Sequence, residues 1–353
     1  MKYKCLTGTS KETQKAFLSL PGTLYKKDCP QNKKTEKAIL NGTHPLSPDF
    51  DIYPFVITDE NRRPICRCIL TIYKNTEEGY VGFFESKNDL TAVKEMMTHV
   101  RQKAKVLGKT KLLGPIDCSI YINYRFKMNM FNRTYTGEPY NKEYYPTLWT
   151  ECGFVVKDKY VSNQMRKVNE EDFDERLDRI YNRYLDRGYT FRGPHGAFQD
   201  ALKDVYSLLV ERYSAFVGAQ GVSQEQFMTL FSSLDKIADY DMIKLAYKDD
   251  ELKGFCIALP NYGSNTRGSL SIRKLFSIMN IKKSPTEYVI LYAGADKSAP
   301  GLGGALMHSI RNELYKNQCT SIAALIHEGN MPQQVYTMLH TEQFTYALYE
   351  YVL

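Results

Sequence analysis

An internal repeat constrains the fold of this chain more than any other feature of its sequence. Near residue 141, and again near residue 330, an asparagine precedes a short helical segment, a phenylalanine and a tyrosine-containing strand-like run. The segments before these points also share an order of strands, helix and strand, which indicates a duplicated domain. The matched positions are Asn141 and Asn330, Tyr145 and Tyr336, Leu148 and Leu339, Phe154 and Phe344, and Tyr160 and Tyr349.

Each half carries apolar runs that predict β-strands, and an amphipathic stretch that predicts a helix. In the first half this helix begins after Asn88 or Asp89 and ends at Gly108, residue types that favour helix starts and ends. A charge-dense stretch, 166–188, predicts a connecting helix. We therefore predict two α/β (α+β) domains, residues 1–165 and 166–353, each with a mixed, mostly antiparallel sheet flanked by helices. The expected strands include residues 51–60, 62–74, 79–86, 109–117, 241–248, 251–262, 287–295 and 319–328.

Composition and charge argue against several classes of function. The net charge of +7 over 353 residues is mild and its lysines are scattered, so we expect no nucleic-acid partner. No apolar run reaches membrane length and the first residues lack the apolar core of a signal peptide, so we expect a cytoplasmic protein that binds no membrane. Cys66 and Cys68 share one face of an expected strand without nearby ligands, which favours buried thiols over a metal site.

The stretch EYVILYAGADKSAPGLGGALMHSIRNELYKN, residues 287–317, leads from a strand through a glycine-rich loop into a helix. A helix start presents unpaired N–H groups and partial positive charge, and glycines let phosphate approach them. A P-loop would need lysine and a hydroxyl residue after Gly304, where the chain has Ala305 and Leu306. A dinucleotide fingerprint would need glycine at position 306 and a longer βαβ series after the loop. A plain turn that binds nothing is the remaining alternative.

The loop resembles the acyl-CoA loop of the GNAT superfamily of N-acetyltransferases: arginine or glutamine, two residues, glycine, any residue, then glycine or alanine. Ser298 stands at the first position beside Lys297, and Gly301 and Gly303 match the glycines. In the first half, GYVGFFESKNDLTAV, GPIDCSI and YNKEYYPTLWTECGF resemble segments of YghO-like tandem GNAT proteins. The resemblance covers most of the chain and extends to acetyltransferases of zwittermicin and paenilamicin self-resistance.

In this superfamily two parallel strands splay apart, and the pantetheine arm of CoA lies between them. The resemblance implies that 287–295 and 319–328 are these strands, that backbone groups of the first bind pantetheine and the oxyanion, and that the loop binds pyrophosphate. Tyr336 is expected to protonate the leaving thiolate, with core packing as the alternative, and Glu328 or His327 to act as base. The expected cofactor-binding residues are Tyr292, Ala293, Gly294, Ala295, Ser298, Gly301, Leu302, Gly303, Gly304, Ala305 and Asn330.

The first half lacks a glycine loop, because Lys87, Asn88 and Asp89 lead into its long helix. An aspartate at a pyrophosphate site would repel the ligand, so we expect a degenerate GNAT-like domain that builds part of the acceptor pocket. The tyrosine-rich segment 121–145, with Glu138 and Glu143, is a candidate lining of that pocket. A packed interdomain loop is the alternative.

These features favour an N-acetyltransferase that moves an acetyl group from acetyl-CoA to a primary amine of a small molecule, as a monomer or homodimer. An antibiotic made by the host is one candidate acceptor. A longer-chain N-acyltransferase acting on an amino acid is an alternative, favoured by any apolar tunnel beyond the thioester. A non-catalytic GNAT-like protein that binds CoA or another ligand is a third, favoured by Ser298 and by the spacing of Tyr336 from Asn330.

Overall fold

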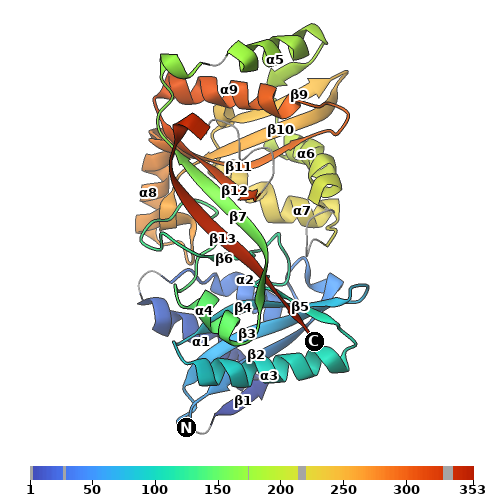
Figure 1. Cartoon of the computed structure of the whole chain (residues 1–353), viewed down its shortest axis with the longest axis vertical. Coiled ribbons are helices and arrows are strands. Elements are labelled where there is room, and N and C mark those ends of the chain that lie inside the picture. Colours follow the sequence, from blue (N-terminus) through green and yellow to red (C-terminus); the bar gives the residue numbers. More distant parts are fainter. Residues whose placement is uncertain (1–2, 27–28, 174, 214–219, 329–336) are drawn as a thin grey trace.

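The computed structural model describes residues 3–26, 29–173, 175–213, 220–328 and 337–353. Within these ranges one mixed sheet runs the length of the molecule in the order β1-β2-β3-β4-β5-β13-β7-β12-β11-β10-β9-β8, with β6 paired to β13. Figure 1 shows the first half of the chain at the bottom, in blue and cyan, and most of the second half at the top, in yellow to red. No helix in the described ranges is long and apolar enough to cross a membrane.

The first half contains the strands and the long helix that the sequence predicts. Asp89 caps the start of α3 by accepting a hydrogen bond from the Ala92 N–H, as the sequence suggests. Helices α1 and α2, which we did not predict, pack against one face of the sheet, and α3 and α4 against the other. The elements are β1 (Lys4–Thr7), α1 (Lys11–Tyr25), α2 (Lys33–Leu40), β2 (Phe50–Thr58), β3 (Pro64–Tyr73), β4 (Glu78–Ser86), α3 (Leu90–Val106), β5 (Lys111–Gly114), β6 (Phe126–Lys127), α4 (Tyr145–Glu151) and β7 (Val155–Met165).

The second half repeats most of this order and adds two helices, while its described residues contain no counterpart of β6 or α4. Helix α5 packs on α9. Helix α8 follows β10 and precedes β11 along the chain, in a stretch for which the sequence analysis predicted no helix. Helices α6 and α7 pack against one face of the sheet and α9 against the other. The elements are α5 (Glu175–Asp186), β8 (Thr190–Arg192), α6 (Phe198–Tyr213), α7 (Gln224–Phe231), β9 (Ile243–Lys248), β10 (Glu251–Pro260), α8 (Ile272–Lys283), β11 (Glu287–Ala295), α9 (Leu302–Asn317), β12 (Thr320–His327) and β13 (His340–Val352).

The two halves exchange their last strands. β7, the last strand of the first half, pairs with β12, while β13, the last strand of the chain, pairs with β5. β7 and β13 also pair with each other along most of their length, and Figure 1 shows this long twisted pair running from one half into the other. The predicted boundary between residues 165 and 166 falls at the end of β7. The sequence analysis did not anticipate the exchange, which joins both halves into one sheet.

The hydrophobic core is also shared between the two halves. One cluster of buried residues includes Phe17 and Val56 from the first half and Phe255 and Phe344 from the second. Two further clusters lie under α3 and under α9. Cys66 and Cys68 both lie in the cluster under α3, so the prediction that they share one strand face is confirmed.

Candidate functional site

The start of α9 is open. Its N-cap residue, Gly301, has a φ of 95°, a left-handed conformation that glycine adopts without strain, and no side chain caps the helix. The Leu302 and Gly304 N–H groups donate to the Ala299 and Gly301 carbonyls at 3.1 and 2.9 Å. A Cβ atom added at Gly301 or Gly303 would meet nothing within 4 Å, so both glycines border open space. This helix start has room for an anion beside its backbone.

Ser298 is held by the loop itself. Its N–H and its hydroxyl both donate to the Asp296 carboxylate at 2.8 Å, and these bonds lower the pKa of Asp296. The Lys253 Nζ lies 3.7 Å from the same carboxylate. The loop therefore carries an ionised carboxylate, and the Ser298 hydroxyl is engaged with it.

The neighbouring strands β11 and β12 diverge near the start of α9. Their parallel pairing ends at Ile290 and Ala323, after which β12 continues alongside β7 alone. β11 bulges between Ile290 and Tyr292 and then stays paired with β10 as far as Ala295. Beyond Ile290, β11 is therefore no longer paired with β12. This is the splay that the resemblance predicts for these two strands.

The corresponding gap in the first half is filled. The pairing of β4 with β5 ends at Tyr80 and Leu113, and the Ile116 N–H then donates to the Val81 carbonyl at 2.9 Å. A Cβ atom added at Gly82 would lie 1.9 Å from the Ile116 carbonyl oxygen, so the chain after β5 lies directly against β4.

Two aspartates complete the contrast between the halves. The Asp117 carboxylate accepts the Phe83 N–H inside the gap between β4 and β5. At the start of α3, the Asp89 carboxylate accepts the Ala92 N–H at 3.0 Å and the Tyr3 hydroxyl at 2.9 Å. The positions that are open in the second half thus hold carboxylates of the protein in the first.

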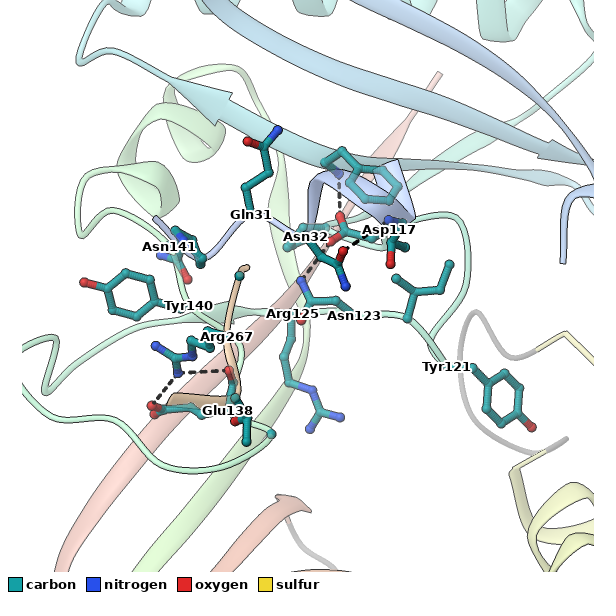
Figure 2. A pocket seen from close by; sticks show the side chains of 18 of the residues that line it. Gln31, Asn32, Asp117, Tyr121, Asn123, Arg125, Glu138, Tyr140, Asn141 and Arg267 are labelled. Carbon is teal, nitrogen blue, oxygen red and sulfur yellow. Dashed lines mark hydrogen bonds and ion pairs between the residues drawn. The ribbon is translucent and has the colours of Figure 1, made fainter. Parts of the chain in front are cut away.

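A cavity of about 510 Å³ lies between the two halves. Figure 2 shows side chains of the segment after β5, including Asp117, Tyr121, Arg125, Glu138 and Tyr140, gathered around it with Arg267 of the second half. Much of the tyrosine-rich segment therefore lines a cavity, although Glu143 does not. The second half contributes Leu230, Leu234, Ile237, Leu259, Thr266, Gly268, Leu291 and Tyr292, the last two of which belong to β11.

Several charges on the cavity wall are neutralised within the protein. Arg67 makes a bidentate pair with Glu36, at 2.7 and 2.8 Å. Glu138 accepts the Lys127 ammonium at 2.7 Å, and Arg267 lies 3.4 Å from its other oxygen. These pairs hold both halves around the cavity, because Arg267 belongs to the second half and Lys127 to the first.

Glu85 and Asp117 line the same cavity and make no ion pair with any described residue. Burial raises the pKa of Glu85 to about 7, although the Tyr145 hydroxyl donates to it at 2.6 Å. Burial also raises the pKa of Asp117 to about 6. Both carboxyl groups can therefore gain or lose a proton near neutral pH.

The candidate bases from the sequence lie elsewhere. The His327 Nε2 lies 3.1 Å from the Asp158 carboxylate, and its ring packs edge-on against Tyr160. Glu328 is exposed, and its N–H donates to the Lys159 carbonyl. Neither residue lines the cavity. Tyr336 and Asn330 lie outside the described residues.

Sequence reasoning missed Glu85 and Asp117 as cavity residues, and it did not single out Arg125 within the candidate lining segment 121–145. A signal existed for the first two, because Glu85 ends the apolar run GYVGFF and Asp117 follows GPI, within two segments that carry the family resemblance. Nothing local marks Arg125, whose neighbours in space include Leu325 on β12.

No protein-family model and no curated protein sequence matches the chain. Among solved structures, a tandem GNAT protein from the clavulanic acid biosynthesis pathway is 10% identical and aligns over 99% of this chain and 98% of its own, with a TM-score of 0.54. A GCN5-related N-acetyltransferase from Anabaena variabilis is 8% identical and aligns over 99% of this chain and 73% of its own, with a TM-score of 0.52. A glucosamine N-acetyltransferase region of a fungal multi-domain β-N-acetylglucosaminidase gives a TM-score of 0.53 at 12% identity, with 99% of this chain but 38% of that one aligned. The chain therefore has the GNAT fold in tandem form.

Proposed function

We propose that the protein is an N-acyltransferase that moves an acetyl group from acetyl-CoA to a primary amine of a small molecule, with its donor site in the second half. One observation carries this proposal: an open helix start at Gly301 lies beside two diverging parallel strands, in a chain with the GNAT fold. The same positions in the first half are filled by Asp89 and by the chain around Asp117.

In this proposal the backbone around Gly301 to Ala305 binds the pyrophosphate of CoA, and backbone groups of Tyr292 to Ala295 bind its pantetheine arm. The amine acceptor occupies the cavity between the halves, which reaches β11 at Leu291 and Tyr292. Holding amine and thioester together supplies much of the rate.

The acceptor amine is protonated at neutral pH and must lose a proton before it attacks. Glu85 and Asp117 are cavity carboxyl groups whose pKa values, about 7 and about 6, suit the transfer of that proton. His327 and Glu328 remain the candidates that the resemblance implies, and Tyr336 the candidate acid for the thiolate.

The narrower expectation of antibiotic self-resistance rests on the resemblance of the first-half segments. A tandem GNAT protein from the clavulanic acid biosynthesis pathway is among the structural neighbours. The cavity volume of about 510 Å³ suits a small acceptor.

The test is calorimetry with acetyl-CoA on three proteins. Gly303→Glu adds a carboxylate at the second helical residue of α9, where it would repel pyrophosphate, so binding should weaken by more than about tenfold. Thr91→Glu makes the same change at the second helical residue of α3 and should leave binding unchanged. If wild-type protein binds no acetyl-CoA, or if the Thr91 variant loses binding and the Gly303 variant keeps it, the proposal fails. Release of free CoA thiol with a panel of amines then tests turnover.

A further inference from the structure

Arg125 is a buried cation on the wall of the cavity. Arg125 lies in the segment between β5 and β6 and is only 4% exposed. The Arg125 N–H donates to the Pro115 carbonyl at 2.9 Å, which fixes the backbone from which the side chain extends. In Figure 2 the side chain extends away from Asp117, towards the side of the cavity that faces the second half.

Two tyrosine rings lie against this guanidinium, at right angles to each other. Its central carbon lies 3.7 Å from the ring centre of Tyr124 and 4.0 Å from that of Tyr160. Because the two rings are perpendicular, with centres 5.9 Å apart, at most one of them stacks on a face of the planar group, and both make cation–π contacts with it. The edge of an arginine is a rigid fork of N–H donors that matches the two oxygens of a carboxylate.

That edge is poorly satisfied by the protein. Among the described residues, its hydrogen bond is a long one, 3.4 Å from Nη1 to the Leu325 carbonyl, and the buried Nε has no acceptor. Among the described residues no carboxylate forms an ion pair with Arg125; Glu138 pairs with Lys127, and one oxygen of Asp158 pairs with His327. Burying a cation without a counter-charge is costly, so such an arrangement is unusual unless a ligand completes it.

Arg67 provides an internal comparison. It lines the same cavity and is also buried, yet it makes a bidentate pair with Glu36 at 2.7 and 2.8 Å. The fold therefore supplies a carboxylate for one cavity arginine and none, among the described residues, for the other.

We propose that Arg125 binds a carboxylate of the ligand that occupies this cavity. Leu325 belongs to β12, so the guanidinium lies beside the diverging strands of the second half. On the proposed function, on which this step rests, the acceptor is then an amino acid or a related compound that carries both an amine and a carboxylate. Cavity carboxyl groups Glu85 and Asp117, which make no ion pair with described residues, add a complementary partner for an ammonium group.

The first experiment needs no CoA. Thermal unfolding of the full chain is followed with benzoate and, at matched concentration and ionic strength, with benzamide, which has nearly the same shape without the charge. We expect benzoate to raise the wild-type Tm and benzamide to have no such effect. Arg125→Met should lose the benzoate effect completely, and its ligand-free Tm should be no lower than that of wild type, because a desolvated charge is removed.

Arg101→Met is the matched control. Arg101 also stacks on a tyrosine, with its central carbon 4.1 Å from the ring centre of Tyr351, but it does not line the cavity. It should keep the benzoate effect in full. Equal shifts from benzoate and benzamide in wild type, or an undiminished benzoate shift in Arg125→Met, would overturn the proposal.

A second experiment separates the source of the carboxylate. With acetyl-CoA as donor, phenylalanine is compared with phenethylamine as acceptor, and Arg125→Met should raise KM for phenylalanine by more than about tenfold while leaving phenethylamine unchanged. If the variant instead affects only succinyl-CoA as donor, the carboxylate belongs to the acyl group and the acceptor assignment is wrong. Failure of the proposed function would appear separately, as absence of acetyl-CoA binding in protein that still responds to benzoate.

Discussion

The two halves of this molecule share an order of elements and differ in what occupies two small spaces. In the second half, α9 begins at an uncapped glycine and β11 diverges from β12 beside it. In the first half, Asp89 caps α3 and the chain after β5 closes the gap beside β4. The fold thus supplies the place for a cofactor site, while a few residues decide whether that place is open. We propose that the first half is degenerate in this sense, and the contrast with the second half can be tested.

Neither half is expected to fold independently of the other. Residues 1–165 alone should fail to fold, because β5 would lose β13, β7 would lose both neighbours, and the core under α3 would lose Ala347 and Tyr349. Circular dichroism and urea titration would check this. A second fragment that joins residues 340–353 to residue 165 through a flexible linker should regain structure. A cooperative transition in the unmodified fragment would contradict the expectation and support the predicted boundary at 165.

Substitutions at two glycines, one from each half, should change the free energy of unfolding by different amounts. Gly82→Ala should destabilise the protein by about 3 kcal/mol or more, because the new methyl group collides with the backbone at Ile116. Gly303→Ala should be neutral or stabilise the protein by up to about 1 kcal/mol, since its methyl group meets open space in a helix. Chemical denaturation measures both. Similar losses at the two sites would mean that the second-half loop is as crowded as the filled gap.

Stability should also depend on pH, through two buried carboxyl groups of the first half. Burial raises the pKa of Glu85 from 4.5 to about 7, so the folded protein binds more protons than the unfolded chain between these values. This contribution makes stability fall as pH rises through that window, by at most about 1.4 kcal/mol per pH unit. Glu85→Gln should flatten the profile of unfolding free energy against pH. Asp117, whose pKa is raised to about 6, adds a slope of the same sign, so the double variant with Asp117→Asn should flatten it further.

Local patterns allowed much of the fold to be predicted. Alternation placed β2, β3 and β4, and the helix-start preference of aspartate placed α3. Helix α8 was not predicted, although Ile272, Leu275, Phe276 and Met279 recur at helical spacing. The structure leaves all four side chains exposed.

The glycine loop could be found from sequence because its residues are contiguous. The cavity could not, since it forms where the segment after β5 meets β11 from the other half. The strand exchange was equally hidden, because β7 and β13 satisfy the same alternation whichever sheet they join. Only the three-dimensional structure decides between the two pairings.

The exchanged strands also bear on the history of such a chain. A duplicated gene normally leaves one copy free to decay and disappear once the other retains the working site. Here deletion of the first copy would remove β7 from the middle of the sheet and leave β12 and β13 without a shared neighbour. Because the halves exchange strands, the sheet of the second half depends on the first half. Selection can therefore remodel its surface and cavity wall, including Arg125, but cannot discard it.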